Sequence, residues 1–107
     1  MDLSLKTYKI QYQPAAEKDL NNVLEYFSEI LDETAYANRI CNFIRMQILT
    51  LKKMPARFAI IDIEPYKHLE IRLMTVRNYN VFYTIHEDSE VHIVRIFHEK
   101  RDWMKLL

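Results

Sequence analysis

The sequence predicts an α+β fold, in which a two-helix hairpin packs on one face of a mostly antiparallel sheet. Three observations support this prediction. A short segment of alternating polarity comes first, two apolar stripes at helical spacing follow, and the later chain holds several segments rich in Ile, Val, Tyr and Phe. Half of the 107 residues are hydrophobic, which is enough for one core. We therefore expect a single domain over residues 1–107.

The first element is expected to be a strand. Residues 6–13 alternate in polarity, with Tyr8, Ile10 and Tyr12 on one face, and this period of two is typical of a strand. Pro14 then suits the first turn of a helix, where its missing N–H costs no hydrogen bond. The strand should therefore lead directly into a helix.

Two apolar stripes predict the helix hairpin, because their members recur at intervals of three and four residues. Asp32 lies between the stripes and can cap the second helix, and Pro55 is expected to end it. Helices with so short a joint should pack antiparallel. The first stripe is Ala16, Leu20, Val23, Leu24, Phe27, Ile30 and Leu31, and the second is Tyr36, Ile40, Phe43, Ile44, Ile48 and Leu51.

A run of four strands is expected to complete the fold. These segments are rich in β-branched and aromatic residues, and turn-forming residues such as Pro65, Asn78 and Asp88 separate them. The predicted order is therefore one strand, two helices and a four-strand, mostly antiparallel run. The four strands are expected at residues 58–64, 69–77, 79–86 and 91–97.

Composition excludes several classes of protein. The chain has no glycine, which excludes P-loops, GxGxxG dinucleotide sites and GxSxG nucleophile elbows, because each needs backbone without a Cβ beside its ligand. The formal charge is zero, unlike that of a general nucleic-acid coat protein. The one cysteine, Cys41, lies among apolar residues and is interpreted as a small buried hydrophobe in a reducing compartment. With no secretory signal and no membrane-length apolar run, we expect a soluble, cytoplasmic protein.

The last third of the chain carries a more specific pattern. Arg72 opens a strand, residues 79–83 read Tyr-x-Val-Phe-Tyr, and the valine-rich strand after them ends in the basic segment His98-Glu-Lys-Arg101. Near the N-terminus, residues 14–20 fit Pro-x-Ala-x-x-Asp-Leu. In this order, over residues 6–107, these motifs resemble the RelE/ParE toxins of type II toxin–antitoxin systems.

That resemblance implies a RelE/ParE-like toxin held inactive by a cognate antitoxin. We expect an acidic antitoxin that wraps the chain with helices, with or without an added strand, because of this resemblance and because apolar side chains extend beyond one stripe at Tyr26, Tyr36, Ala37 and Cys41. Ribonuclease relatives cleave mRNA on the ribosome without a metal, whereas ParE toxins block DNA gyrase by binding. Here we favour a ribosome-dependent mRNA endonuclease, keep a gyrase inhibitor as the alternative, and retain as a third class an interaction module without toxicity.

Three residues are the candidates for catalysis of mRNA cleavage. In this reaction the ribose 2′-hydroxyl attacks the adjacent phosphate, so fixed cations and a proton-transfer group are needed. The resemblance points to Arg72 and Arg77 as the cations and to His98 as the acid or base. Five residues apart, the arginines fall on opposite faces of an ideal strand, so a shared site needs a bulge. A purely structural role remains open for each of the three.

A second group of cations is expected to bind RNA. Lys52, Lys53 and Arg57 lie at the helix-to-strand corner, where family ribonucleases carry catalytic lysines, and Arg101 follows the last predicted strand. A structural reading also remains, because lysines in a last helical turn favour the helix dipole. Without four close metal ligands in the sequence, we expect neither metal nor cofactor. Against the enzyme reading, the strongest ribonuclease members are strongly basic, and the Arg-Asp-Trp ending at Trp103 is more similar to the ParE side.

Overall fold

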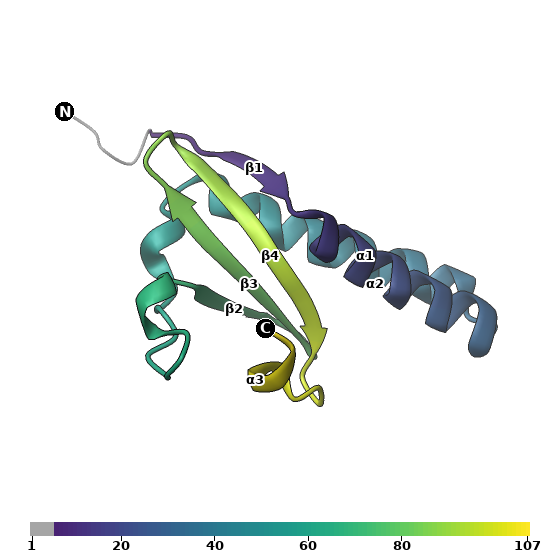
Figure 1. Cartoon of the computed structure of the whole chain (residues 1–107). Helices are drawn as coiled ribbons and strands as arrows, with labels where there is room; N and C mark the ends of the chain where they lie inside the picture. The colour runs from purple at the N-terminus through teal and green to yellow at the C-terminus, as the bar shows by residue number, and fades with distance from the viewer. Residues whose placement is uncertain (1–5) are drawn as a thin grey trace.

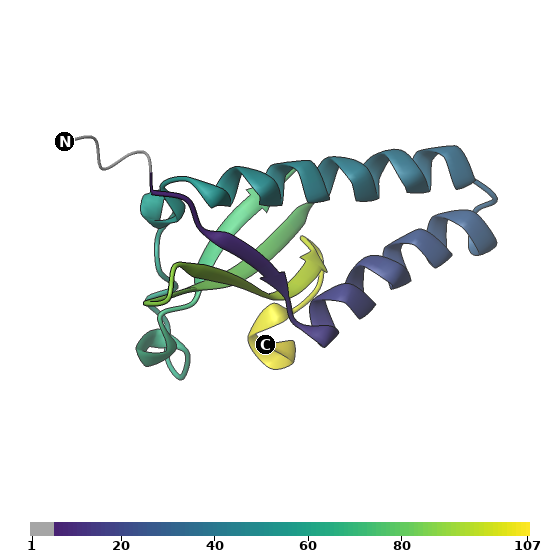
Figure 2. The ribbon, with the colours of Figure 1, turned by 90° about the horizontal axis from the view of Figure 1, so that it is seen from above.

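A helix hairpin covers one face of a four-stranded sheet in the structure, a computed structural model that describes residues 6–107 (Figure 1). The hairpin extends beyond the end of the sheet (Figure 2), so the molecule is elongated, with extents of 50 × 32 × 22 Å. None of its helices is long and apolar enough to cross a membrane, within the residues described. The main elements are β1 (Lys9–Tyr12), α1 (Pro14–Glu25), α2 (Thr34–Leu49), β2 (Arg72–Val76), β3 (Tyr79–His86), β4 (Glu90–His98) and α3 (Trp103–Leu106).

The sheet is mixed, with the strand order β1-β4-β3-β2. The three later strands form an antiparallel meander, and β1 adds to β4 in parallel, so the mostly antiparallel prediction is confirmed. The predicted strand at residues 58–64 is wrong, because it forms only one isolated bridge, from Ile60 to Arg72. Ile61 is instead buried against the sheet face away from the helices, and β1 supplies the fourth strand.

The start of α1 is where the sequence predicted it, whereas the joint between the two helices differs from the prediction. Pro14 is the first residue of α1, as expected, and after Glu25 the chain continues as a π-helical turn over Tyr26–Ile30. Asp32 has a left-handed backbone with φ 53° and does not cap α2. The cap position belongs to Glu33, which makes no side-chain capping bond. The predicted cap is therefore wrong by one residue.

The end of α2 also differs from the prediction. The helix stops at Leu49, and a 3₁₀ turn follows over Thr50–Lys52. Pro55 does not end α2 but begins a second 3₁₀ turn, Pro55–Arg57. The guanidinium of Arg57 donates hydrogen bonds to the carbonyls of Thr50, Lys53 and Met54, so it satisfies carbonyls at the end of the helical segment.

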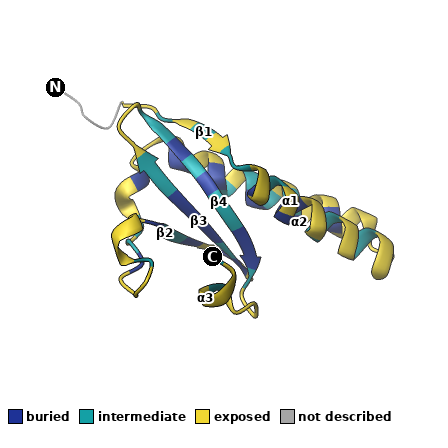
Figure 3. Cartoon of the chain, in the orientation of Figure 1, coloured by how far each residue is buried: buried dark blue, intermediate teal, exposed yellow. Residues whose placement is uncertain are grey.

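The core lies on both faces of the sheet. Between helices and sheet, the predicted stripe residues Leu20 and Ile44 are buried, and Val23, Phe27 and Phe43 pack against them half-buried. The other face has a smaller cluster covered by α3 and the segment before β2, and Figure 3 shows the contrast between the buried sheet and the exposed end of the hairpin. This second cluster is Ile61, Ile71, Phe82 and Phe97, with Trp103 and Leu107 packed on it.

A chain without glycine must use other residues wherever the backbone is left-handed. Five described residues have φ between 50° and 63°, and none of them is glycine. Each such position costs a non-glycine residue on the order of 1 kcal/mol. One of them, Arg77, lies in the tight turn between β2 and β3 and is also a predicted site residue. The full set is Asp32, Met54, Glu70, Arg77 and Ser89.

Candidate functional site

The predicted site residues fall into two groups at different ends of the sheet. Register places Arg72 opposite Tyr83 and places His98 opposite Tyr79, on the two strands that flank β3. Tyr79 and Tyr83 are four positions apart on β3, a distance of about 13 Å along the strand. Arg77 lies in the turn beside Tyr79, at the same end as His98. Without a bulge in the pairing of β2 with β3, Arg72 and Arg77 do not share a site.

Arg72 is held in the scaffold of the corner between α2 and β2. Its Nη1 donates to the carbonyl oxygens of Ala56 at 3.1 Å and Phe58 at 2.6 Å. Beside it, the fully buried Tyr83 donates its hydroxyl to the carbonyl of Pro55 at 2.6 Å. Burial raises the pKa of the Tyr83 phenol, which therefore remains a neutral donor. These bonds fix the backbone of a corner that forms no ladder of its own.

The other cationic side chains of this corner differ in how many hydrogen bonds they make. Arg57 is occupied by backbone carbonyls and also donates through Nη2 to the Thr50 hydroxyl at 2.6 Å. Lys52 and Lys53 are exposed, and the Lys52 carbonyl accepts the N–H of Tyr8. The corner therefore presents two lysine side chains over a rigid, arginine-bonded backbone.

His98 has a defined setting at the other end of the sheet. Its ring lies 5.3 Å from that of Tyr79 in an edge-to-face contact. The Nδ1 atom accepts the backbone N–H of Lys100 at 3.1 Å, which in the neutral ring places the proton on Nε2. Burial, with smaller contributions from Tyr36 and Cys41, raises the pKa of the Tyr79 phenol to about 12. Tyr79 is thus a neutral phenol over the whole physiological range.

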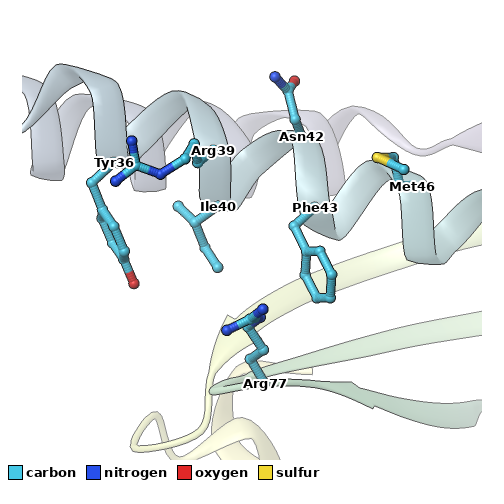
Figure 4. A pocket seen from close by; sticks show the side chains of 7 residues that line it. All are labelled: Tyr36, Arg39, Ile40, Asn42, Phe43, Met46 and Arg77. Carbon is cyan, nitrogen blue, oxygen red and sulfur yellow. The ribbon is translucent and has the colours of Figure 1, made fainter.

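Two hollows flank this end of the sheet. The first, of about 480 Å³, lies between α1 and the end of β4, where His98, Lys100 and Arg101 meet Tyr26 and Phe27. Of the predicted site residues, His98 and Arg101 are therefore brought together here. The second hollow, of about 400 Å³, lies between α2 and the turn that carries Arg77. Figure 4 shows Arg77 pointing from that turn toward α2.

The other residues considered in the sequence analysis lie in or beside the hydrophobic core. Tyr83 and Trp103, considered for stacking on bases and preferred as packing residues, lie in the two core clusters, with Tyr83 fully buried. Cys41 is half-buried, its thiol lies 3.7 Å from the Leu20 carbonyl oxygen, and burial raises its pKa. Within residues 6–107, no set of three His, Cys, Asp or Glu side chains could hold a metal ion.

Two important features were missed in the sequence. The first is the ion pair between Asp19 and Arg95, in which the buried carboxylate joins α1 to β4. Asp19 lies three residues after Ala16 and four before Val23, so its helical spacing already placed it on the apolar face. The second is Arg39, which lines the α2 hollow one turn from Tyr36 and Phe43. Asp19 is the Asp of the motif at residues 14–20, which was noted for the resemblance alone, and Arg39 lies outside every segment noted there.

Comparison with known proteins decides the family. A family model described as "ParE toxin of type II toxin-antitoxin system, parDE" matches residues 10–103. The chain belongs to the ParE toxin family. This confirms the resemblance and makes the chain a RelE/ParE toxin of a type II toxin–antitoxin system. Among curated protein sequences there is no significant match.

Solved structures support the fold of this ParE-family toxin. The chromosomal ParDE toxin–antitoxin system of P. aeruginosa contains a chain with a TM-score of 0.71 and 18% identity, and the match covers 87% of this toxin and 97% of that chain. The RelBE2 toxin–antitoxin complex of Mycobacterium tuberculosis gives a TM-score of 0.66 and 19% identity over 91% and 97%. At these identities the likeness shows the RelE/ParE-like fold alone.

Proposed function

We propose that this ParE-family toxin acts by binding its target rather than by catalysis, with DNA gyrase as the target, and that a cognate antitoxin holds it inactive. One observation carries the first part. Arg72 and His98 are on opposite sides of β3 and about 13 Å apart along it, so the catalytic set expected from the sequence, in which both residues act on one phosphodiester, does not converge. The Nη1 group of Arg72 also donates hydrogen bonds to two backbone carbonyls, those of Ala56 and Phe58.

The choice of gyrase follows from the family. The resemblance implied gyrase inhibition for the ParE side, and the matching family is ParE. The formal charge of zero agrees with a protein partner, because phosphate neutralisation would favour a basic chain. A toxin that acts by binding also does not need an acid, a base and phosphate-binding groups to lie together at one site.

An antitoxin partner is supported by the relatives and by the surface. Both solved relatives come from toxin–antitoxin pairs. In this chain, large apolar side chains stay exposed along the hairpin, in a pattern that marks interaction surfaces. They comprise Tyr26, Ile30, Leu31, Tyr36, Met46 and Leu49.

Ribosome-dependent mRNA cleavage is the second candidate, and one observation favours it. His98 and Arg101 line one hollow together with Lys100, and Arg77 lies in the neighbouring turn. In such a reaction His98 would act either as the base that takes the proton of the 2′-hydroxyl or as the acid that gives a proton to the leaving 5′-oxygen. Arg77 and Arg101 would then stabilise the phosphoryl charge, and Lys52, Lys53 and Arg57 at the far corner would bind more distant RNA.

Induced expression of the toxin in bacteria tests the two candidates side by side. Plasmid supercoiling and primer-extension maps of mRNA ends are measured in the same cultures, with and without the co-expressed antitoxin. Gyrase inhibition predicts arrested growth, relaxed plasmid, unchanged mRNA ends and recovery with the antitoxin. New mRNA ends with unchanged supercoiling would contradict the proposal and favour the second candidate.

A further inference from the structure

A hollow between α2 and the β2–β3 turn combines apolar walls with two arginines, and we name it the Arg77 groove. In Figure 4, Tyr36, Ile40 and Phe43 point from α2 toward the turn, and Arg77 points up to Phe43. The guanidinium of Arg77 lies 4.4 Å from the centre of the Phe43 ring. The residues that line the groove are Tyr36, Arg39, Ile40, Asn42, Phe43, Met46 and Arg77.

Among the residues that the structure describes, neither arginine of the groove has an acidic partner. Over residues 6–107, the ion pairs of the structure involve neither Arg39 nor Arg77, whose contacts are with the Tyr36 and Phe43 rings. By comparison, Arg45 on the same helix is paired with Glu17 at 3.1 Å. The groove therefore offers two positive charges that an incoming carboxylate can neutralise.

Arg77 is held at some energetic cost. Its φ of 52° is left-handed, in a turn of two residues between β2 and β3 where glycine is preferred. An arginine there is strained relative to glycine, and its guanidinium is nevertheless held over the Phe43 ring. Strain of this kind concentrates at functional positions.

The walls of the groove favour a peptide over a phosphate. Ile40 is buried, Phe43 is half-buried, and the Met46 side chain is 64% exposed beside them. A nucleic-acid backbone would leave these apolar surfaces without a partner, whereas an aliphatic or aromatic side chain would bury them. The fitting ligand is thus a peptide segment with a carboxylate next to an apolar side chain.

We propose that the Arg77 groove holds a segment of the cognate antitoxin, in which an Asp or Glu side chain contacts Arg39 and Arg77 while a neighbouring apolar side chain packs on Phe43 and Met46. This inference rests on the proposed function, which supplies the antitoxin. The antitoxin is assigned rather than the target because exposed Tyr36, Met46 and Leu49 continue the apolar surface along α2. In a stored toxin that surface favours aggregation unless a partner covers it.

Calorimetry with the purified toxin and the antitoxin co-expressed with it tests the proposal. Arg77→Glu and Arg39→Glu should each weaken binding by roughly 30-fold or more, the loss typical of an interface hot spot. Lys18→Glu is the matched control, because it reverses one exposed charge on α1 and should leave the affinity unchanged. Arg77→Gln should also weaken binding, and it does so without placing an acidic side chain in the groove. Circular dichroism verifies that each variant is folded.

Each outcome separates this inference from the proposed function. Failure of the wild-type toxin to bind any co-expressed antitoxin would overturn the proposed function, and the inference with it. Wild-type binding that persists in folded Arg77→Glu, Arg77→Gln and Arg39→Glu overturns the inference alone. If the same variants lose gyrase inhibition but keep their affinity for the antitoxin, the inference is also overturned, because the groove would then contact the target. A charge swap tests direct contact. If changing one antitoxin Asp or Glu to Lys restores its binding to the Arg77→Glu toxin, the two side chains are in contact.

Discussion

The carboxylate of Asp19 accepts two hydrogen bonds from the guanidinium of Arg95, at 2.8 and 2.9 Å, and a third from the backbone N–H of Ile96 at 2.9 Å. This fork joins the middle of α1 to β4, between residues 76 positions apart in the sequence. Hydrogen bonding to Asp19 raises the pKa of Arg95 above its ordinary value. The pair therefore fixes the hairpin on the sheet, and Asp19 also lines the hollow between α1 and the end of β4.

Removal of the charge on Asp19 should destabilise the toxin far more than removal of an exposed carboxylate. Asp19→Asn removes the anion at the buried end of the pair and leaves the partly buried Arg95 guanidinium without it, so we expect a loss of ~3 kcal/mol in the free energy of unfolding. Glu17→Gln breaks an exposed pair with Arg45 and should cost less than ~1 kcal/mol. Urea denaturation of both variants measures the difference, and equal midpoints would refute this role of Asp19.

Periodicity predicted the elements well because it reports which face of an element is buried. It gave the hairpin and the antiparallel meander, but it carries no information on which strand edges meet. The parallel pairing of β1 with β4 was therefore missed. Residues 58–64 are as apolar as a strand, yet Ile61 is buried by covering the second sheet face. Strand propensity describes burial on a pleated surface as much as backbone pairing.

The left-handed turn at Arg77 predicts an unusual order of stabilities. Arg77→Gly and Arg77→Ala both lose the contact with Phe43, but only glycine relieves the strain of φ 52°. The glycine variant should be more stable than the alanine variant by about 1 kcal/mol. Thermal unfolding of the pair under identical conditions tests this order, and an alanine variant as stable as the glycine variant would contradict it.

Arg72 should behave as a scaffold residue. Arg72→Gln loses the bonds to the carbonyls of Ala56 and Phe58, so the free energy of unfolding should fall by ~1–3 kcal/mol. Gyrase inhibition by the folded fraction should be unchanged. Lys53→Gln removes the same charge at an exposed position and should change stability by no more than ~0.5 kcal/mol. Lost activity in a fully stable Arg72→Gln variant would instead indicate a direct functional role.

Alkaline pH should destabilise the fold through Tyr79. Its folded pKa of about 12 exceeds the ordinary value of 10.0, so between these limits the unfolded chain releases the proton and the folded chain retains it. Stability must therefore fall as pH rises from 10 toward 12, by at most ~2–3 kcal/mol. Tyr79→Phe should flatten this part of the pH profile, and Tyr26→Phe, at an exposed ring, should not. Equal profiles for the two variants would contradict the assignment.

The candidate site was less predictable than the fold. The segments containing Arg77, His98 and Arg101 were singled out because the resemblance to the RelE/ParE toxins pointed to them. Their separation from Arg72 depends on the register of β2 with β3 and of β3 with β4, which only the folded chain fixes. Arg39 was missed because one arginine on a helix normally reads as a solvated residue.

Gyrase supercoiling titrated with the purified toxin tests binding without catalysis most directly. The assay holds relaxed plasmid, gyrase and ATP, and it contains neither ribosomes nor mRNA. Our account predicts that inhibition rises with toxin until gyrase is saturated, and that added antitoxin restores supercoiling. His98→Gln should inhibit nearly as well, since few interface residues carry a large share of the binding energy. Undiminished supercoiling at saturating toxin, together with mRNA cleavage on ribosomes that is lost in His98→Gln, would contradict it.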